Sequence, residues 1–522
     1  MDDNVDMTGV ADADRATLQE LSQRRLLELA RERDVRGRTG MDREALVEAL
    51  LPADPEDGRA DGIPRTGDVQ RPAGSRFEAF RELAEARARG EMVFLPRLLQ
   101  GHDRRLHVRQ TVREDHQVRI ANHDQEAEEK FAKLDASLFS FFRGTCLLFF
   151  RDMAGEDAWM PTVLTLGDVH PENFGVMPSY DNVPIFGSND FDEAFYAPFT
   201  WDLKRGATGF VIAAGEVGDH GPKRAAKIVR AFVRGYLEAL RGYAGAGQED
   251  REQIRQDNAP ELVASLIDDA QQSRADWLER KYLDEYKRGF RADEEHLPVS
   301  HRREEFQEAL HRFVDENDVD VPDRTPGMKV KDVCIRLGQG TQSLGLPRYY
   351  LLVEGPNADG SDDVIIEFKQ ARRSALAGLV PPSEFTLDGN AERISHAQGV
   401  HLVRGDRFYG AVELDGLSFM VRERAPYREK IDLSDLSKKE WSTYAGICGR
   451  SLAHSHAMSD ESGLLDYDVE PAILAAAGAD DLFVDDIVCF AAEAADRVRR
   501  DHEHFRTDYR LGAFRTIDHV FR

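Results

Sequence analysis

Two acidic segments in the first half of the chain carry the residue types of a phosphotransferase site. The first reads Leu166-Gly-Asp168-Val-His170-Pro-Glu-Asn173-Phe-Gly, and the second reads Asn-Asp190-Phe-Asp192-Glu-Ala. Kinase-type enzymes use an Asp to position or deprotonate the acceptor hydroxyl, and they use a following Asn and a later Asp to hold Mg²⁺ on the phosphates. The pattern therefore predicts a catalytic pair and three metal ligands: Asp168 as the base, His170 orienting it, and Asn173, Asp190 and Asp192 around Mg²⁺.

An ordinary turn capped by Asp and Asn is the alternative explanation of the first segment. Two features favour the site over the turn. A strand-like run at residues 161–166 leads directly into the segment, so its side chains would be aimed from a rigid scaffold. The second acidic cluster and Trp201-Asp-Leu follow it, and carboxylate and amide oxygens are the ligands that Mg²⁺ prefers.

A glycine-rich segment in the second half of the chain is predicted to approach phosphates. Its small residues are Gly338, Gly340, Ser343 and Gly345. The segment lies between two strand-like runs, so we expect a hairpin loop whose backbone N–H groups face a triphosphate. Lys369 ends the next strand-like run, where kinases place the lysine that binds the α- and β-phosphates and pairs with a helix Glu. Glu392 is the expected partner and Glu384 the alternative.

Neither a glycine-rich turn nor a lysine at the end of a strand is specific alone. Most such turns only reverse the chain, and most such lysines are surface charges. The order of glycine-rich turn, strand, lysine and helix with Glu is what favours a nucleotide site.

We expect an α+β fold with two lobes, preceded in the sequence by three smaller parts. Apolar periodicity predicts helices over 76–150, 200–320, 436–458 and 468–506, and strands over 161–166, 333–337, 349–353, 364–368 and 417–421. The expected organisation is a tail (1–14), a helical module (15–52), a linker rich in Pro, Gly and Asp (53–75), a helical lobe with the acidic loops (76–330), a β-rich nucleotide lobe (331–425) and a helical segment that completes the catalytic lobe (426–522).

Composition excludes some classes of function. The formal net charge of −27 argues against a protein that coats nucleic acid, although it leaves room for a local basic site. The chain has no apolar run long enough for a membrane span, and its acidic beginning lacks the features of a secretion signal. The four cysteines are far apart, which is typical of reduced thiols. We therefore expect a cytoplasmic protein with no membrane contact.

His454 and His456 lie in a small-residue, apolar stretch that predicts a buried helix. Side chains two positions apart point to different faces of a helix, so a shared zinc site is not expected. They are interpreted as hydrogen-bonded core or interface histidines.

Residues 15–52 resemble the SAP-like domain at the amino end of the Rho terminator. Leu18, Leu21, Leu26, Leu27, Leu29 and Ala30 form one apolar face, and Ala45, Leu46, Ala49 and Leu50 form a second. Gly37 and Gly40 separate the two helices, and Asp42 can cap the second. The resemblance implies nucleic-acid contact or, alternatively, protein docking or a spacer role.

The motifs occur in an order that differs from that of a typical kinase. The catalytic loop and metal Asp come first, at 167–192, and the glycine loop, Lys369, the strand of residues 417–424 and the Leu-Ala-His-Ser-His-Ala helix follow. If the chain is followed in a circle, the order is the same. We interpret this as a circular permutation, which proteins tolerate when the severed ends lie at the surface.

Over about residues 76–515 the chain resembles the bacterial domain-of-unknown-function family 2252. The matching segments include Phe142-Arg-Gly, GDVHPENFG, NDFDEA with WDLKR, Ser343-Leu-Gly-Leu-Pro-Arg-Tyr, FKQARRS, VRER and YAGICGRSLAHSHA. The family is similar to aminoglycoside and choline-type phosphotransferases. That resemblance implies Asp168 as base, Asn173 and Asp190 as metal ligands, Lys369 as phosphate anchor, and Gly340 and Gly345 in the nucleotide loop.

The sequence departs from those enzymes at two positions. Leu166 stands where a His often precedes Gly-Asp, and Ser343 stands where the third glycine of the loop is expected. Three functions are therefore compared. The first is an ATP- and Mg²⁺-dependent phosphotransferase acting on a hydroxyl of a small-molecule or protein acceptor. The others are a nucleotide-binding pseudokinase that docks partners through residues 15–52, and a nucleotidyl transferase.

Overall fold

The computed structural model describes residues 26, 30, 43–50, 76–122, 125–338, 346–380, 390–462 and 464–515. The chain divides into two compact units, Met1–Ala73 and Gly74–Arg522. In the first unit, Leu26 and Ala30 are helical and buried, as predicted, and α3 (Arg43–Leu50) forms the expected second helix. Leu46 and Leu50 are buried as expected, whereas Ala45 is exposed and Val47 is buried in its place. The remainder of the SAP-like pattern lies outside the described residues.

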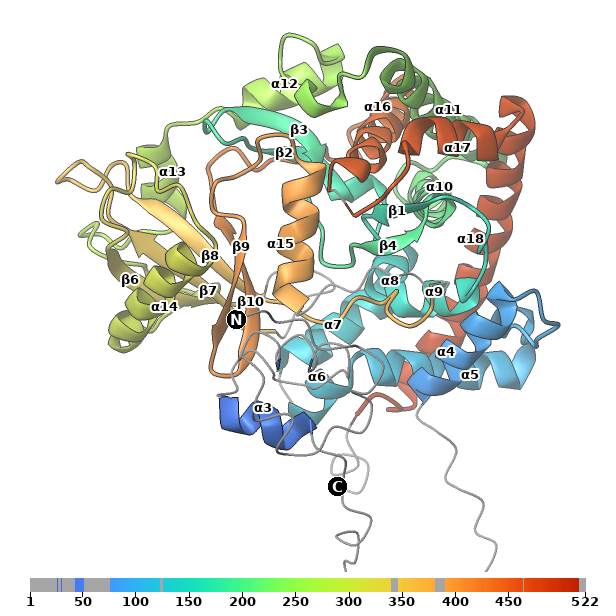
Figure 1. The fold of residues 1–522 in the computed structure, drawn as a ribbon, viewed down its shortest axis with the longest axis horizontal. Coiled ribbons are helices and arrows are strands. Elements are labelled where there is room, and N and C mark those ends of the chain that lie inside the picture. Colours follow the sequence, from blue (N-terminus) through green and yellow to red (C-terminus); the bar gives the residue numbers. More distant parts are fainter. Residues whose placement is uncertain are drawn as a thin grey trace, which may run out of the picture. The chain divides into compact units, whose positions relative to one another are not determined.

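The second unit has a large helical part (Figure 1). Its helices are α4 (Arg76–Ala88), α5 (Gly101–Asp115), α6 (Gln117–Asn122), α7 (Gln125–Ala136), α8 (Leu138–Gly144), α9 (Cys146–Met153), α10 (Phe199–Glu216), α11 (Pro222–Ala246), α12 (Glu261–Ala270), α16 (Lys438–Ala457), α17 (Val469–Ala477) and α18 (Asp480–Arg510). Helix α10 is buried along nearly its whole length, which places it at the centre of the packing. Helices α11 and α16 approach so closely that a Cβ at Gly449 would lie 2.0 Å from the Phe232 carbonyl oxygen.

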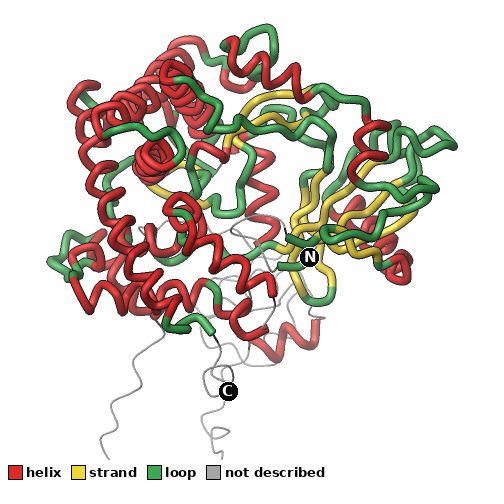
Figure 2. The backbone as a smooth tube through the Cα atoms, turned by 180° about the vertical axis from the view of Figure 1, so that it is seen from behind, coloured by secondary structure: helices red, strands yellow, loops and turns green. Residues whose placement is uncertain are grey.

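The second unit also contains a six-stranded antiparallel sheet. Its strands are β5 (His296–Pro298), β6 (Val330–Arg336), β7 (Arg348–Val353), β8 (Val364–Gln370), β9 (Gly410–Leu414) and β10 (Leu417–Glu423), in the spatial order β5-β6-β7-β8-β10-β9. Figure 2 shows these strands gathered away from the large helices. The predicted strands at 333–337, 349–353, 364–368 and 417–421 are all confirmed. β5 joins the sheet from before residue 331, so the β-rich part begins earlier than the change in sequence character indicates.

The two faces of the sheet differ because side chains alternate along a strand. One face packs under α14 (Arg303–Glu316) through Phe306, Leu310 and Phe313. On the other face, Tyr350, Leu352 and Ile365 pack against residues of α13 (Arg274–Lys281) and the segment after it. The end of this second face that α13 does not cover carries charged side chains, and α15 (Asn390–His401) lies between the sheet and the helices (Figure 1).

Two short pairs of strands lie in the helical part. β1 (Thr162–Thr165) pairs with β4 (Phe195–Pro198), and β2 (Phe174–Pro178) pairs with β3 (Pro184–Ser188), both antiparallel. β1 confirms the strand expected before the first acidic segment. β2 and β3 were not predicted, because they are buried on both faces and show no alternation of apolar and polar residues.

Within the described part of the chain, no helix combines the length and the apolar character needed to cross a bilayer.

Candidate functional site

The first acidic loop is held by a side chain from α10. Asp202 is fully buried, and its carboxylate accepts hydrogen bonds from the backbone N–H of Leu166 (2.6 Å) and of Gly167 (2.9 Å). Gly167 has φ of +80°, and a Cβ there would lie 2.3 Å from the carbonyl oxygen of Glu193. A glycine is required at this position for both reasons. No role for Asp202 was predicted from the sequence, although its motif follows the second acidic segment.

We expect Gly167→Ala to destabilise the fold strongly, because the substitution forces a left-handed backbone and a clash with Glu193. The free energy of unfolding should fall by about 2 kcal/mol or more, in line with backbone strain plus overpacking. Gly242→Ala is the matched control, since a Cβ there meets nothing within 4 Å. It lies in α11 and should be neutral or slightly stabilising. Denaturant unfolding measures both, and equal stability of the two variants would contradict this account of the loop.

Asp168 and Arg205 form a buried ion pair at the centre of the loop. Arg205 Nη2 lies 2.5 Å from Asp168 Oδ1, and the guanidinium also packs 4.2 Å from the Phe142 ring centroid. Burial raises the pKa of Asp168 above its ordinary value, although the charge of Arg205 opposes the shift. The pair occupies Oδ1, so Oδ2 is the oxygen left to face another group.

His170 is neutral and lies beside the Asp168 carboxylate. Burial holds the pKa of His170 well below its ordinary value. Its Nδ1 accepts from the Glu172 N–H at 3.2 Å, which leaves the proton on Nε2, 3.8 Å from Asp168 Oδ2. His170 therefore caps the amino end of the short helix η4 (Pro171–Asn173) and also lies beside Asp168.

The β2–β3 pair brings the two predicted metal segments together. Phe174 is opposite Ser188, so Asn173 and Asn189 lie at the same end of the pair, and the Asn189 N–H donates to the Asn173 carbonyl oxygen at 3.1 Å. Asn173 Nδ2 donates to the Asp168 carbonyl oxygen at 2.7 Å, which leaves Oδ1 as the atom available to a metal ion. Asp190 follows Asn189 directly.

Lys369 reaches this site from the sheet. Its Nζ forms an ion pair with Asp192, 177 positions earlier in the chain. Burial raises the pKa of Asp190, but the positive charges of Lys369 and Lys430 outweigh that effect and hold the pKa below its ordinary value. The acidic loop and the lysine strand therefore converge on one place.

The carboxyl end of the glycine-rich segment also lies beside Lys369. β6 and β7 are antiparallel neighbours, so the segment joins them as a hairpin connection. Arg348, just after the segment, is opposite Lys369 on β8, and the Gln370 N–H donates to the Pro347 carbonyl oxygen at 3.0 Å. Gly338 is exposed with φ of +71°. The other residues predicted in the loop, Gly340, Ser343 and Gly345, lie outside the described residues.

The salt bridge expected between Lys369 and Glu392 is replaced by the pair with Asp192. Glu392 is exposed in the first turn of α15, and Glu384 lies outside the described residues. The neighbouring side chain, Arg393, faces inward instead. It donates to the backbone oxygens of Asp192 (2.8 Å) and Ala194 (2.6 Å), so α15 supports the second acidic segment with a cation. Helix rotation could not be read from the sequence here, because the helix is weakly amphipathic.

A cluster of arginines that was not predicted from the sequence surrounds Glu367. Glu367 is fully buried on β8, with Arg422 Nε at 2.5 Å and Arg348 Nη1 at 3.4 Å. Burial acts to raise the pKa of Glu367, but the charges of Arg422, Arg348, Arg424 and Arg428 bring it well below its ordinary value. One carboxylate thus faces several guanidinium groups on the charged end of the sheet. In the sequence, the close spacing of Arg422, Arg424 and Arg428 was the signal that could have predicted this cluster.

His456 links α16 to the same loop. Its Nε2 lies 3.1 Å from Asp202 Oδ2, and its Nδ1 lies 2.8 Å from the Tyr236 hydroxyl. His454 contacts the Glu249 carbonyl oxygen at 2.9 Å. Both are hydrogen-bonded on different faces of the helix, as predicted.

A family model described as an uncharacterized protein conserved in bacteria, DUF2252, matches residues 123–508. This match spans both acidic segments, the lysine strand and α16. No curated protein and no solved structure matches the chain.

Proposed function

We propose that this chain, which belongs to the DUF2252 family of conserved bacterial proteins, is an ATP- and Mg²⁺-dependent phosphotransferase that acts on a hydroxyl group. One observation carries the proposal. The Lys369 amine meets the acidic loop of Asp190 and Asp192, although 177 positions separate Lys369 from Asp192. A kinase-like site needs this convergence, and the motif order supports a circularly permuted kinase-like fold.

The donor atoms near the acidic loop fit a hard cation. Asn173 offers an amide oxygen and Asp190 a carboxylate whose lowered pKa keeps it ionised. Oxygen donors of this kind, with phosphate oxygens and waters, are what Mg²⁺ takes, and its role when bound would be to neutralise phosphate charge. Asp192 would join them once a phosphate replaces it as the partner of Lys369.

The chain's own residues supply the remaining roles. Asp168 presents Oδ2 to the acceptor hydroxyl while Arg205 fixes Oδ1, so the carboxylate is oriented to accept the proton. Lys369 and the arginines of the charged sheet end favour a polyphosphate on a chain that is otherwise strongly acidic. The acceptor attacks in line, and catalysis comes mainly from positioning and charge neutralisation.

Turnover should fall in acid at a higher pH than an ordinary Asp would produce. The base works as a carboxylate, so activity is complete above the pKa of Asp168 and is lost as the pH falls through it. Burial raises that pKa, which shifts the acid limb upward from the ordinary value of about 3.9. The measurement is kcat/KM against pH, with circular dichroism at each pH to verify folding. An acid limb at or below the ordinary value would contradict Asp168 as the base.

Nucleotide binding and product mass together test the function. We expect ATP with Mg²⁺ to raise Tm, and ATP to be consumed in the presence of some member of a panel of hydroxyl metabolites. Mass spectrometry then distinguishes a gain of phosphate from a gain of AMP, which would indicate nucleotidyl transfer. A Tm shift without turnover across the panel would favour a nucleotide-binding scaffold, and no Tm shift would overturn the nucleotide site itself.

A further inference from the structure

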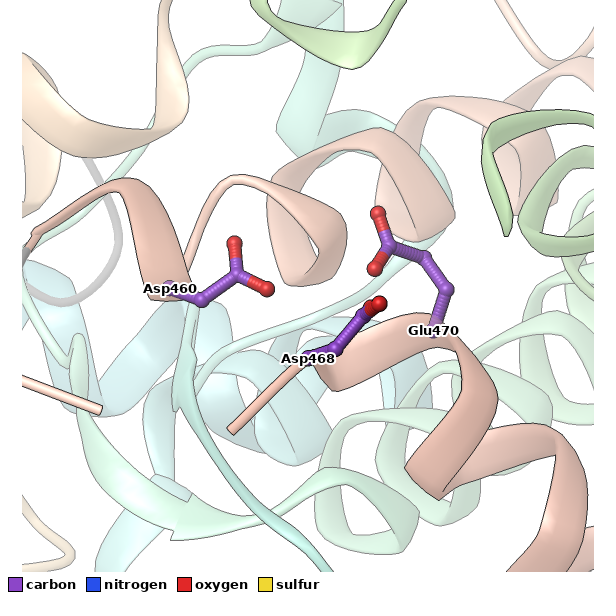
Figure 3. Close-up of side chains that lie close together, drawn as sticks. All are labelled: Asp460, Asp468 and Glu470. Carbon is purple, nitrogen blue, oxygen red and sulfur yellow. The ribbon is translucent and has the colours of Figure 1, made fainter. Parts of the chain in front are cut away.

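Three carboxylates gather outside the phosphotransferase site. Asp460 lies in the short helix η7 (Asp460–Ser462) that follows α16, Asp468 precedes α17, and Glu470 lies in the first turn of α17. One carboxylate oxygen of each residue lies within 4.8 Å of the others. Figure 3 shows the three side chains facing a common point from the two ends of one loop.

Within this cluster, one buried carboxylate oxygen of Glu470 lacks a hydrogen-bond partner among the residues that the structure describes. Glu470 is 3% exposed, and its Oε1 has no hydrogen-bond partner in the described part of the chain. Asp460 has a partner at the amino end of α17, because its Oδ2 accepts a hydrogen bond from the Val469 N–H at 3.0 Å. No lysine or arginine among the described residues forms an ion pair with any of the three.

We propose that Asp460, Asp468 and Glu470 bind one hard divalent cation, Ca²⁺ or Mg²⁺, at a site separate from the nucleotide site. A Ca²⁺ ion takes carboxylate oxygens at about 2.3–2.6 Å, so one ion placed among the three can reach an oxygen of each. The ligand set contains oxygen only, which disfavours zinc and copper. The exposed position of Asp468 leaves room for water ligands.

The bound cation would stabilise the position of β1, the strand that leads into the first acidic loop. Ser459, next to Asp460, accepts from the Leu164 N–H at 3.0 Å. Tyr467, next to Asp468, donates its hydroxyl to the Thr162 carbonyl oxygen. Ser459 and Tyr467 therefore both hydrogen-bond to β1. A cation bound by Asp460 and Asp468 would stabilise both of these hydrogen bonds. This effect concerns stability and does not depend on phosphoryl transfer.

The test uses the full chain after removal of metal with a chelator and without nucleotide. Separate titrations with CaCl₂ and MgCl₂ are followed by Tm and by calorimetry. We expect one of the ions to raise Tm and to bind at one site per chain. Asp468→Asn and Glu470→Gln should weaken that binding tenfold or more. Asp466→Asn, an exposed change in the same loop, should bind as the original chain does.

The Asp190→Asn variant separates this site from the nucleotide site. The cation-induced rise in Tm should persist in Asp190→Asn and be lost in Asp468→Asn. No rise with either ion in the original chain would overturn the proposal. An equal rise in Asp468→Asn, Asp460→Asn and the original chain would overturn it as well. Failure of the phosphotransferase assay leaves these binding measurements intact.

Discussion

Asp168→Asn is expected to remove nearly all phosphoryl transfer while nucleotide binding persists. General-base catalysis contributes about 10²–10⁴-fold, and an amide cannot accept the proton. The Asn oxygen can still accept from Arg205, which in the structure lies 2.5 Å from Asp168 Oδ1, so the buried guanidinium keeps a partner. The measurement is turnover with the acceptor found in the panel, beside the Tm shift produced by ATP with Mg²⁺.

Asp181→Asn is the matched control for this variant. Asp181 makes a surface ion pair with Arg404 at 3.0 Å, which contributes little to stability. Its turnover should equal that of the original chain. If Asp168→Asn folds, binds nucleotide and retains most of the turnover, Asp168 is not the base and the assignment of the loop is wrong.

Lys369→Met is expected to weaken ATP binding by about 10- to 100-fold. A hydrogen bond to a charged group contributes about 1.5–3 kcal/mol, and each 1.4 kcal/mol is a factor of ten in affinity. Met retains an unbranched apolar stem on β8 but removes the amine that meets Asp192. Calorimetric titration with a non-hydrolysable ATP analogue and Mg²⁺ gives the affinity directly.

The double variant Lys369→Met with Asp192→Asn identifies the cause of that loss. Lys369→Met alone leaves the partly buried Asp192 carboxylate without its partner, and the second change removes this unpaired charge. We expect stability to recover in the double variant while ATP affinity stays low, because the phosphate anchor is still missing. Recovery of the original affinity would mean that Lys369 only neutralises Asp192, and would contradict its role as an anchor.

The candidate site residues are easier to predict from the sequence than the residues that hold them in place. Asp168, Asn173 and Asp190 stand in short motifs whose spacing along the chain indicates their chemistry. Asp202 stands in the WDLKR motif and Arg393 in no motif, but in neither case does the spacing indicate that the side chain holds the backbone of an acidic segment. A residue that acts by hydrogen bonding to distant backbone leaves no periodic signal, so only coordinates identify it.

The sequence by itself determined the main strands, the buried α16 helix and the residue types of the two acidic segments, because periodicity and turn residues are local properties. Only the tertiary structure decided which partner each charge takes. Lys369 pairs with Asp192 instead of Glu392, and Glu367 gathers arginines from neighbouring strands. These pairings depend on strand register and helix rotation, which long-range packing sets and local sequence does not encode.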